Sequence, residues 1–172
     1  MTETLPFRRD LLITSLCAAL PLALAAGEAE ASKIDPAQTI VRLPDQIAWK
    51  SPPDFPEHSV ESAPLFGSTE GDGLYLTLVR WWPGYMSAPH AYVTDRLCVV
   101  VSGTWWVNSG ADFDPGNTIP APAGTFVRRV AHTPHYDGVK KDGKEPAIIA
   151  ICGMAPVHVK WFDPKPPRWR RV

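Results

Sequence analysis

Two segments of the chain carry the side chains that could do chemistry together. The first contains His90-Ala91-Tyr92 and, after three further residues, Arg96. The second contains His132 and His135. Neutral imidazoles are ligands for Zn, Fe, Mn, Ni or Cu, and an arginine can hold a carboxylate through two parallel hydrogen bonds. The two segments therefore indicate a small-molecule site, with a divalent metal as its candidate cofactor.

The elements that must position these residues are predicted to be strands. Beyond Ser32 the apolar residues do not recur every 3.6 positions, and prolines interrupt every stretch up to Leu65, so no helix is predicted. Short runs rich in β-branched and aromatic residues lie between Gly, Pro, Asn and Asp turns. We predict strands at 39–43, 47–50, 74–82, 87–92, 97–101, 104–107, 125–130 and 147–152. Many short strands with close turns predict an all-β sandwich or barrel.

The glycines that frame both segments carry a resemblance to the cupin superfamily. The first cupin motif runs Gly, five residues, His-x-His, three or four residues, Glu, six residues, Gly. The chain has this spacing from Gly84 to Gly103, with Tyr92 at the second histidine position and Arg96 at the glutamate position. The second motif has its histidine at His135, eleven residues after Gly124. The resemblance implies a cupin-type double-stranded β-helix, a jelly-roll barrel, over about residues 39–154.

The resemblance also implies a metal site, with fewer matching ligands than the full motif. It places His90 and His135 at ligand positions, which predicts that both imidazoles face one cavity. His132 would reach the site only if its turn bends suitably; otherwise it is a loop histidine. Tyr92 would be a third ligand or a general acid.

Arg96 has two interpretations. Facing the cavity, it would repel a metal and orient an anionic substrate. Alternatively it forms a structural ion pair with Asp95, Asp137 or another carboxylate. Residue type and spacing alone slightly favour the ion pair.

The first 31 residues are predicted to be a cleaved export signal. Arg8-Arg9 precede an apolar run of 16 residues, from Leu11 to Ala26, which is shorter than the ~20 residues of a membrane-spanning helix. The segment resembles a twin-arginine signal, although an ordinary secretory signal remains an alternative. We therefore expect residues 32–163 to form a single barrel with an N-terminal arm, 164–172 to be a solvated Pro- and Arg-rich tail, and the mature protein to be periplasmic or secreted without a membrane anchor.

The near-equal numbers of basic and acidic residues bear on the partners that bind through a strong electrostatic field. The whole chain has 17 basic and 18 acidic residues. That balance gives no electrostatic reason to expect binding to nucleic acid or to a membrane surface. A small-molecule ligand is the expected partner.

Tryptophans and cysteines give two further expectations. In each of the pairs Trp81-Trp82 and Trp105-Trp106, alternation turns one side chain inward and the other outward. An outward tryptophan is usually covered, which makes a homodimer possible. Cys98 and Cys152 would form a disulfide only if neighbouring strands bring them within reach; two small buried side chains are the favoured alternative.

Two functions follow from these observations. The first is a metal-dependent enzyme acting on a small organic molecule, such as an oxygenase, isomerase or lyase. The second is a metal-free binding or sensing module that uses the same cavity. The sequence names neither a reaction nor a substrate.

Overall fold

The computed structural model describes residues 34–35, 37–165 and 167–172. The chain divides into two units, Met1–Val41 and Arg42–Val172. The predicted export signal lies outside the described residues. In the first unit the Asp35 carboxylate accepts hydrogen bonds from the Ala37 amide (2.9 Å) and the Gln38 side chain (2.7 Å), which closes a turn. No helix in the described part of the chain is long and apolar enough to span a bilayer.

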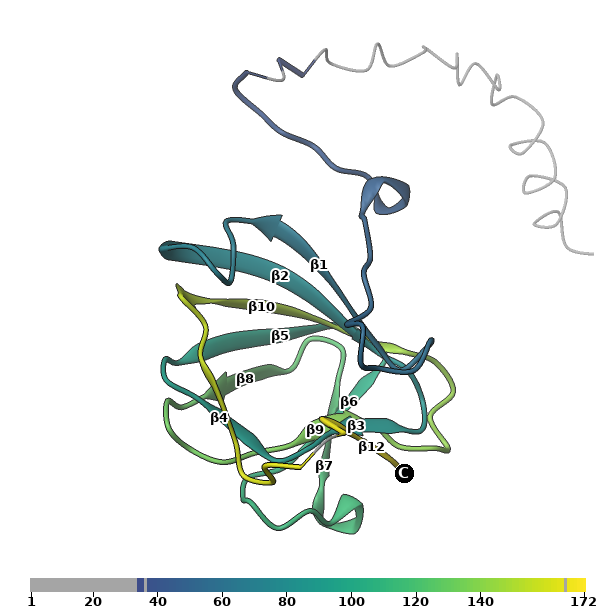
Figure 1. Ribbon diagram of the computed structural model, residues 1–172. Coiled ribbons are helices and arrows are strands. Elements are labelled where there is room, and N and C mark those ends of the chain that lie inside the picture. Colours follow the sequence, from purple (N-terminus) through teal and green to yellow (C-terminus); the bar gives the residue numbers. More distant parts are fainter. Residues whose placement is uncertain (1–33, 36, 166) are drawn as a thin grey trace, which may run out of the picture. The chain divides into compact units, whose positions relative to one another are not determined.

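The second unit is built from strands and two short 3-10 turns (Figure 1). The turns are η1 (Pro44–Gln46) and η2 (Pro115–Asn117). The strands are β1 (Val60–Phe66), β2 (Gly73–Trp81), β3 (Tyr85–Ser87), β4 (His90–Tyr92), β5 (Arg96–Ser102), β6 (Thr104–Val107), β7 (Ile119–Pro122), β8 (Phe126–Arg129), β9 (Asp137–Val139), β10 (Ala147–Ala155), β11 (Val159–Trp161) and β12 (Trp169–Arg171). The prediction of an all-β fold is confirmed.

These strands form two five-stranded sheets and one two-stranded sheet. The first sheet has the order β1-β2-β10-β5-β8, and the second has the order β12-β3-β9-β6-β7. Strands β11 and β4 pair with each other. All the paired strands run antiparallel. This arrangement is that of a jelly-roll barrel, as predicted.

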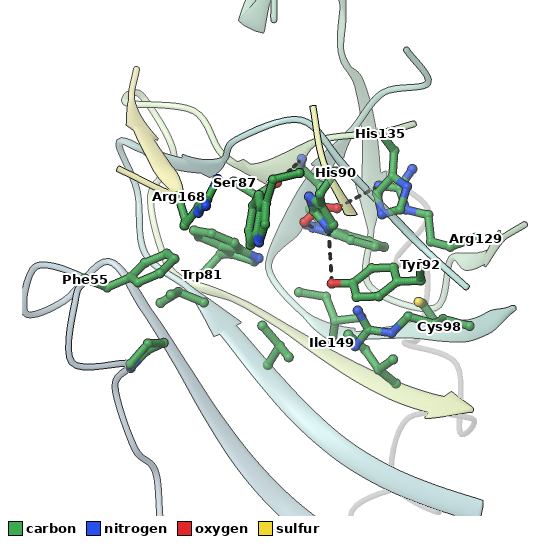
Figure 2. Close-up of a pocket in the computed structure, with 18 residues that line it drawn as sticks. Phe55, Trp81, Ser87, His90, Tyr92, Cys98, Arg129, His135, Ile149 and Arg168 are labelled. Atoms are coloured by element: carbon green, nitrogen blue, oxygen red, sulfur yellow. Dashed lines mark hydrogen bonds and ion pairs between the residues drawn. The ribbon is translucent and has the colours of Figure 1, made fainter. Parts of the chain in front are cut away.

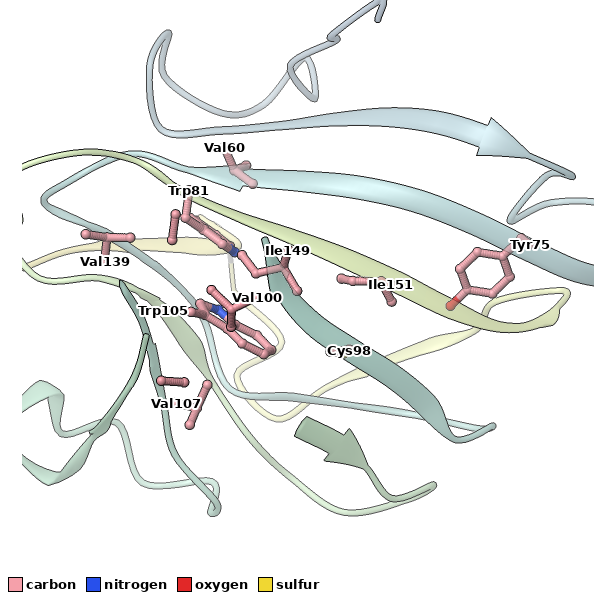
Figure 3. Close-up of a cluster of buried hydrophobic side chains, with 12 residues drawn as sticks. Val60, Tyr75, Trp81, Cys98, Val100, Trp105, Val107, Val139, Ile149 and Ile151 are labelled. Atoms are coloured by element: carbon pink, nitrogen blue, oxygen red, sulfur yellow. The ribbon is translucent and has the colours of Figure 1, made fainter. Parts of the chain in front are cut away.

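Alternation along the strands builds the core. Trp81 on β2 and Trp105 on β6 are buried, whereas their neighbours Trp82 and Trp106 are half-buried. Val100, Ile149 and other apolar side chains from both sheets pack with the two buried tryptophans (Figure 3). The predicted alternation of each tryptophan pair is therefore confirmed.

The chain itself partly covers the two outward tryptophans. The edge of the His58 ring meets Trp82 at 4.7 Å between centroids, and the Trp82 indole donates to Glu61 (2.9 Å). The Lys140 ammonium lies 3.9 Å from the centroid of Trp106. Neither indole therefore requires a second subunit to cover it.

Strands with long apolar runs were predicted better than short ones. Predictions at 74–82, 97–101, 104–107, 125–130 and 147–152 match β2, β5, β6, β8 and β10. The run 87–92 is divided by Ala88-Pro89 into the end of β3 and all of β4, while 39–43 and 47–50 form no named strand. The predicted solvated tail is also wrong for its last residues, because β12 pairs with β3 from Trp169 opposite Ser87 to Arg171 opposite Tyr85.

The glycines that bound the two motifs adopt positive φ angles. Gly84, Gly103 and Gly124 have φ of 89°, 69° and 87°. At Gly103 an added Cβ would also strike the Pro146 carbonyl oxygen and lie 2.9 Å from the Ala147 Cα, both backbone atoms. Around Gly124 the same atom would meet nothing within 4 Å.

This difference predicts two stability costs of unequal size. Gly103→Ala combines an unfavourable φ with a backbone clash and should lower the free energy of unfolding by about 3 kcal/mol or more. Gly124→Ala has only the unfavourable φ and should cost about 1 kcal/mol. Chemical denaturation of both variants measures the difference. Equal costs would show that the approach of residues 146–147 to Gly103 is not tight.

The two cysteines lie on neighbouring strands but face opposite ways. Cys98 on β5 is opposite Ile151 on β10, and Cys152 is opposite Leu97. Cys98 therefore points into the barrel and Cys152 points outward, and both are free thiols. Burial raises the pKa of the Cys98 thiol to about 11, so it remains protonated at neutral pH.

Candidate metal and ligand site

The barrel encloses a cavity of about 200 Å³ (Figure 2). Aromatic and apolar side chains make up most of its wall, and the polar groups come from β3, β4, β5, β8 and β9 and from residues beside them. The lining residues are Pro52, Phe55, Val60, Val79, Trp81, Ser87, His90, Tyr92, Arg96, Cys98, Trp105, Arg129, His135, Asp137, Ile149, Ile151, Trp161 and Arg168. A concave, largely apolar chamber with few polar groups is typical of a small-molecule site.

His90 and His135 meet inside this cavity. Each donates its backbone N–H to the other's carbonyl at 2.9 Å, which fixes β4 beside the residues that lead into β9. Their ring centroids are 4.4 Å apart, and both residues are buried. The prediction that the two imidazoles face one cavity is therefore confirmed.

Backbone carbonyls fix the same tautomer in both rings. His90 Nδ1 lies 2.8 Å from the Ala88 oxygen, and His135 Nδ1 lies 3.1 Å from the Thr133 oxygen. A carbonyl can only accept, so each Nδ1 carries the proton and each Nε2 keeps a lone pair. Metal-binding histidines are commonly oriented in this way.

Asp137 adds a carboxylate to the two histidines. Donor atoms of His90, His135 and Asp137 all lie within 4.8 Å of one another. Asp137 Oδ1 accepts from the Trp105 indole (3.1 Å), and Oδ2 accepts from Arg129 (3.0 Å). Because a carboxylate has about four lone-pair positions, these two bonds leave acceptor capacity on both oxygens.

This donor set fits a divalent transition metal. Two imidazoles and one carboxylate are the ligands that zinc and non-haem iron take in proteins. The three donor atoms lie within 4.8 Å of one another, whereas ligand atoms bonded at about 2.1 Å to one tetrahedral ion lie about 3.4 Å apart. Metal binding would therefore draw these side chains closer together.

The charge states at neutral pH also suit metal binding. Burial lowers the pKa of His135 to about 3, with Arg129 and His90 acting in the same direction. Burial likewise lowers the pKa of His90. Burial alone would raise the pKa of Asp137, but opposing interactions, the Arg129 charge foremost among them, outweigh burial, and the pKa is lowered. The site therefore presents two neutral imidazoles and one carboxylate.

Tyr92 stands directly beside this cluster. Its hydroxyl lies 3.1 Å from His90 Nε2, and because that nitrogen carries no proton, the hydroxyl is the donor. Burial raises the pKa of Tyr92, which keeps it a phenol at neutral pH. A metal bound at His90 Nε2 would take the lone pair that accepts this hydrogen bond, and the hydroxyl would then be free to donate to a ligand in the cavity.

Arg96 also lines the cavity, and the predicted ion pair with Asp95 or Asp137 is wrong. Asp95 instead pairs with Arg128, and Asp137 pairs with Arg129. Within the described residues Arg96 has no carboxylate within 4.0 Å; it donates Nε–H to the Tyr75 hydroxyl (3.0 Å). Its guanidinium lies 4.1 Å from the centroid of the Tyr92 ring. The cation is thus held by two phenols and has no anionic partner.

His132 does not reach the cluster. It is exposed, it has φ of 62°, and its amide donates to the Tyr92 carbonyl (2.7 Å). The turn therefore bends away from the cavity, and the alternative of a loop histidine describes this position.

Three further cavity residues were absent from the predicted site: Asp137 as a ligand, Arg129 and Arg168. Asp137 follows His135 by two residues, the same spacing as His90 and Tyr92, so the alternation rule could have found it. Arg129 lies opposite Arg96 on the paired strands β8 and β5. Arg168 comes from the tail, and no sequence signal places it at the cavity.

Comparison with known proteins shows which solved structures share the fold of this chain. No protein-family model and no curated protein sequence matches the chain. Among solved structures, a polyketide cyclase from Streptomyces resistomycificus matches with a TM-score of 0.60 and 13% identity, over 74% of this chain and 88% of that one. A sugar phosphate isomerase of the cupin superfamily from Silicibacter pomeroyi matches with a TM-score of 0.54 and 17% identity, over 69% of this chain and 79% of the other.

An RmlC-like cupin from Shewanella frigidimarina matches with a TM-score of 0.50 and 14% identity, over 67% of this chain and 90% of the other. Identities this low show a shared fold and no shared reaction. The antiparallel barrel, its paired cavity histidines and these structural neighbours lead to one conclusion: the chain has the fold of the cupin superfamily.

Proposed function

We propose that the protein binds one divalent transition metal at His90, His135 and Asp137 and holds a small anionic organic molecule beside it. The observation that carries the proposal is the convergence of two Nε2 lone pairs and one carboxylate within 4.8 Å in a buried cavity. Three deeply buried polar groups aimed at one point suit a shared ligand better than they suit a barrel core.

In this proposal Asp137 supplies the carboxylate that the resemblance placed at position 96. It comes from β9, whereas Arg96 begins β5. Compared with the family motif, the wall of the cavity at position 96 therefore carries a cation in place of an anion. A metal in the cluster would supply Lewis acidity or a bound water of lowered pKa.

The ligand's anionic group is assigned to Arg96. The cavity lining contains three arginines and one carboxylate, and that carboxylate is already paired with Arg129. The remaining positive charge favours an anion. Arg96 can bind a carboxylate with two parallel N–H groups while its Nε stays on Tyr75.

Tyr92 is assigned the role of proton or hydrogen-bond donor. Its hydroxyl is directed at the metal-binding edge of His90, and its ring lies against Arg96. A ligand spanning the metal cluster and Arg96 would therefore pass this hydroxyl. Two of the structural neighbours are a cyclase and an isomerase. Enzymes therefore occur on this fold, but the neighbours do not name a reaction for this chain.

Metal analysis of the purified protein tests the proposal. Plasma mass spectrometry should find about one equivalent of a divalent metal in the wild type and in His132→Ala, since His132 lies outside the cluster. His90→Ala and His135→Ala should each retain less than about a tenth of an equivalent, because two donors hold a divalent ion poorly. A wild type that binds no metal from any supplied salt would overturn the metal assignment.

The second candidate is a metal-free binding module. One observation favours it: the Tyr92 hydroxyl already occupies the His90 lone pair, and Arg129 already neutralises Asp137. The cluster is thus hydrogen-bonded without an ion. A protein that never takes up metal but binds small carboxylates through Arg96 would be this module.

We also propose that the mature chain is exported. The support is the sequence of residues 1–31, with Arg8-Arg9 ahead of a short apolar run. N-terminal sequencing of protein from the native host should begin near Ser32. An intact N-terminus on protein from the cytoplasm would contradict export.

A further inference from the structure

The cavity wall carries a second cation that the contact proposed at Arg96 leaves unused. Of the three arginines that line the cavity, Arg129 is neutralised by its ion pair with Asp137. The other two, Arg96 and Arg168, have no carboxylate within 4.0 Å among the described residues. With both histidines neutral, the lining therefore carries two positive charges that no side chain of the wall compensates.

The Arg168 side chain is held in place and keeps donors for a ligand. Its guanidinium lies 4.9 Å from the centroid of the Trp161 ring, and that ring lies 5.1 Å from the ring of His90. Nη1 donates to the Asp163 carbonyl oxygen (2.8 Å). No other hydrogen bond of this guanidinium is made within the described part of the chain, so the remaining N–H groups can serve an anion.

The backbone ties Arg168 to one of the proposed metal ligands. The Ala88 amide donates to the Arg168 carbonyl (2.9 Å), and the Ala88 carbonyl accepts from His90 Nδ1 (2.8 Å). The pairing of β12 with β3, which sets Trp169 opposite Ser87, continues from this contact. The C-terminal segment is therefore a fixed part of the cavity wall, and the place of Arg168 relative to His90 is set by hydrogen bonds.

The two uncompensated cations lie on either side of His90. Figure 2 shows Arg168 to the left of His90 and Tyr92 to its right. Arg96 belongs to the Tyr92 side, because its guanidinium lies 4.1 Å from the centroid of the Tyr92 ring. Most of the remaining lining is aromatic or apolar. The cavity is thus an apolar chamber with a cation toward each end and the histidines between them.

We propose that the cavity binds a small dianion, with an apolar body and two carboxylate groups, one held by Arg96 and the other by Arg168. The inference rests on the anion contact proposed at Arg96 and adds Arg168 as the residue that selects for a second anionic group. Two carboxylates compensate both positive charges of the wall, whereas a monoanion leaves one guanidinium without a counter-charge. The apolar lining suits the body of such a molecule.

Titration calorimetry with paired probes tests the second anion. Succinate, adipate and isophthalate are each compared with the corresponding monoamide, which keeps one carboxylate and replaces the other by a neutral group of similar size. At least one dianion should bind the wild type about 10-fold or more tightly than its monoamide. Arg168→Met keeps an apolar stem against Trp161 but loses the charge. It should abolish this preference and leave the affinity for the monoamide within about threefold of the wild type.

Arg171→Gln is the matched control, because Arg171 is exposed, belongs to the same strand β12 and does not line the cavity. It should keep the preference of the wild type. Arg168→Gln provides a second variant in case Arg168→Met fails to fold, with far-UV circular dichroism as the check on folding.

The outcomes separate this inference from the function on which it rests. A wild type without a preference for the dianions, or Arg168 variants that keep the preference, overturns the role of Arg168 and leaves the contact at Arg96 standing. Monoamides that bind Arg96→Gln as tightly as the wild type overturn both assignments, and so does a wild type that binds none of the probes. A preference that is lost in both Arg168 variants and kept in Arg171→Gln is the result expected.

Discussion

Asp137→Asn is expected to remove the bound metal and to lower the free energy of unfolding by about 3–5 kcal/mol. Asp137 and Arg129 form an ion pair in which both side chains are about nine-tenths buried. The asparagine leaves the guanidinium buried beside Trp105 without a counter-charge, which is the costly way to break such a pair. It also removes the only negative ligand from the cluster of His90, His135 and Asp137.

Chemical denaturation and plasma mass spectrometry measure the two effects. Asp95→Asn is the matched control, because Asp95 forms an ion pair with Arg128 at the surface and lies outside the cavity lining. Its metal content should equal that of the wild type, and its stability loss should be clearly smaller. An Asp137→Asn protein that keeps a full equivalent of metal would show that the histidines recruit another ligand.

Arg96→Gln is expected to weaken the binding of small carboxylates by roughly 10- to 100-fold while leaving the metal in place. The guanidinium is held between Tyr75 and Tyr92, and no carboxylate of the described residues forms an ion pair with it. A charge-assisted, bidentate contact in a partly dry cavity contributes about 1.5–3 kcal/mol, and each 1.4 kcal/mol is tenfold in affinity. Glutamine keeps a polar side chain but loses the charge and the paired N–H groups.

Isothermal titration with acetate, succinate and benzoate, and with their neutral amides, measures this preference. The wild type should bind at least one of the acids more tightly than its amide, and Arg96→Gln should lose that difference. Arg170→Gln serves as the control, since Arg170 pairs with Asp163 and does not line the cavity. If Arg96→Gln binds the acids as the wild type does, the anion is held elsewhere, for example at Arg168.

The central strands could be predicted from the sequence because their signal is local. β5 and β10 are runs in which apolar residues, mostly Val, Ile, Leu and Ala, predominate, and such runs indicate strands. β9 has three residues, one of them Gly138, and its pairing partners β3 and β6 are distant in sequence. Its existence depends on tertiary pairing that no local pattern reports.

The two histidines were placed correctly because the glycine frame fixed their spacing, and His90 and His135 do meet. Asp137 was considered only as an ion-pair partner, although its two-residue spacing from His135 puts both on one face. Asp95 was considered as a partner of Arg96, but successive residues of a strand point to opposite sides. Pairing of β5 with β8 instead brings Arg128 to Asp95.

His132 could not have been excluded from sequence. The residue type of a histidine does not predict a positive φ. The side chain is directed to solvent by the folded turn, in which the His132 amide donates to the Tyr92 carbonyl. Alternation also separates the outward from the inward apolar residues of a strand. Applied to β5, the same rule separates Cys98 and Val100 from Leu97, Val99 and Val101 and reveals a second apolar face.

The most direct test of the metal site is an anomalous difference map from crystals of the zinc-loaded protein, measured at the zinc absorption edge. The site predicts one strong peak in the cavity, about 2.0–2.1 Å from Nε2 of His90 and of His135 and about 2.0–2.2 Å from an oxygen of Asp137. Zinc found only on surface residues, or a cavity without a peak at full zinc loading, would contradict a metal centre in this barrel.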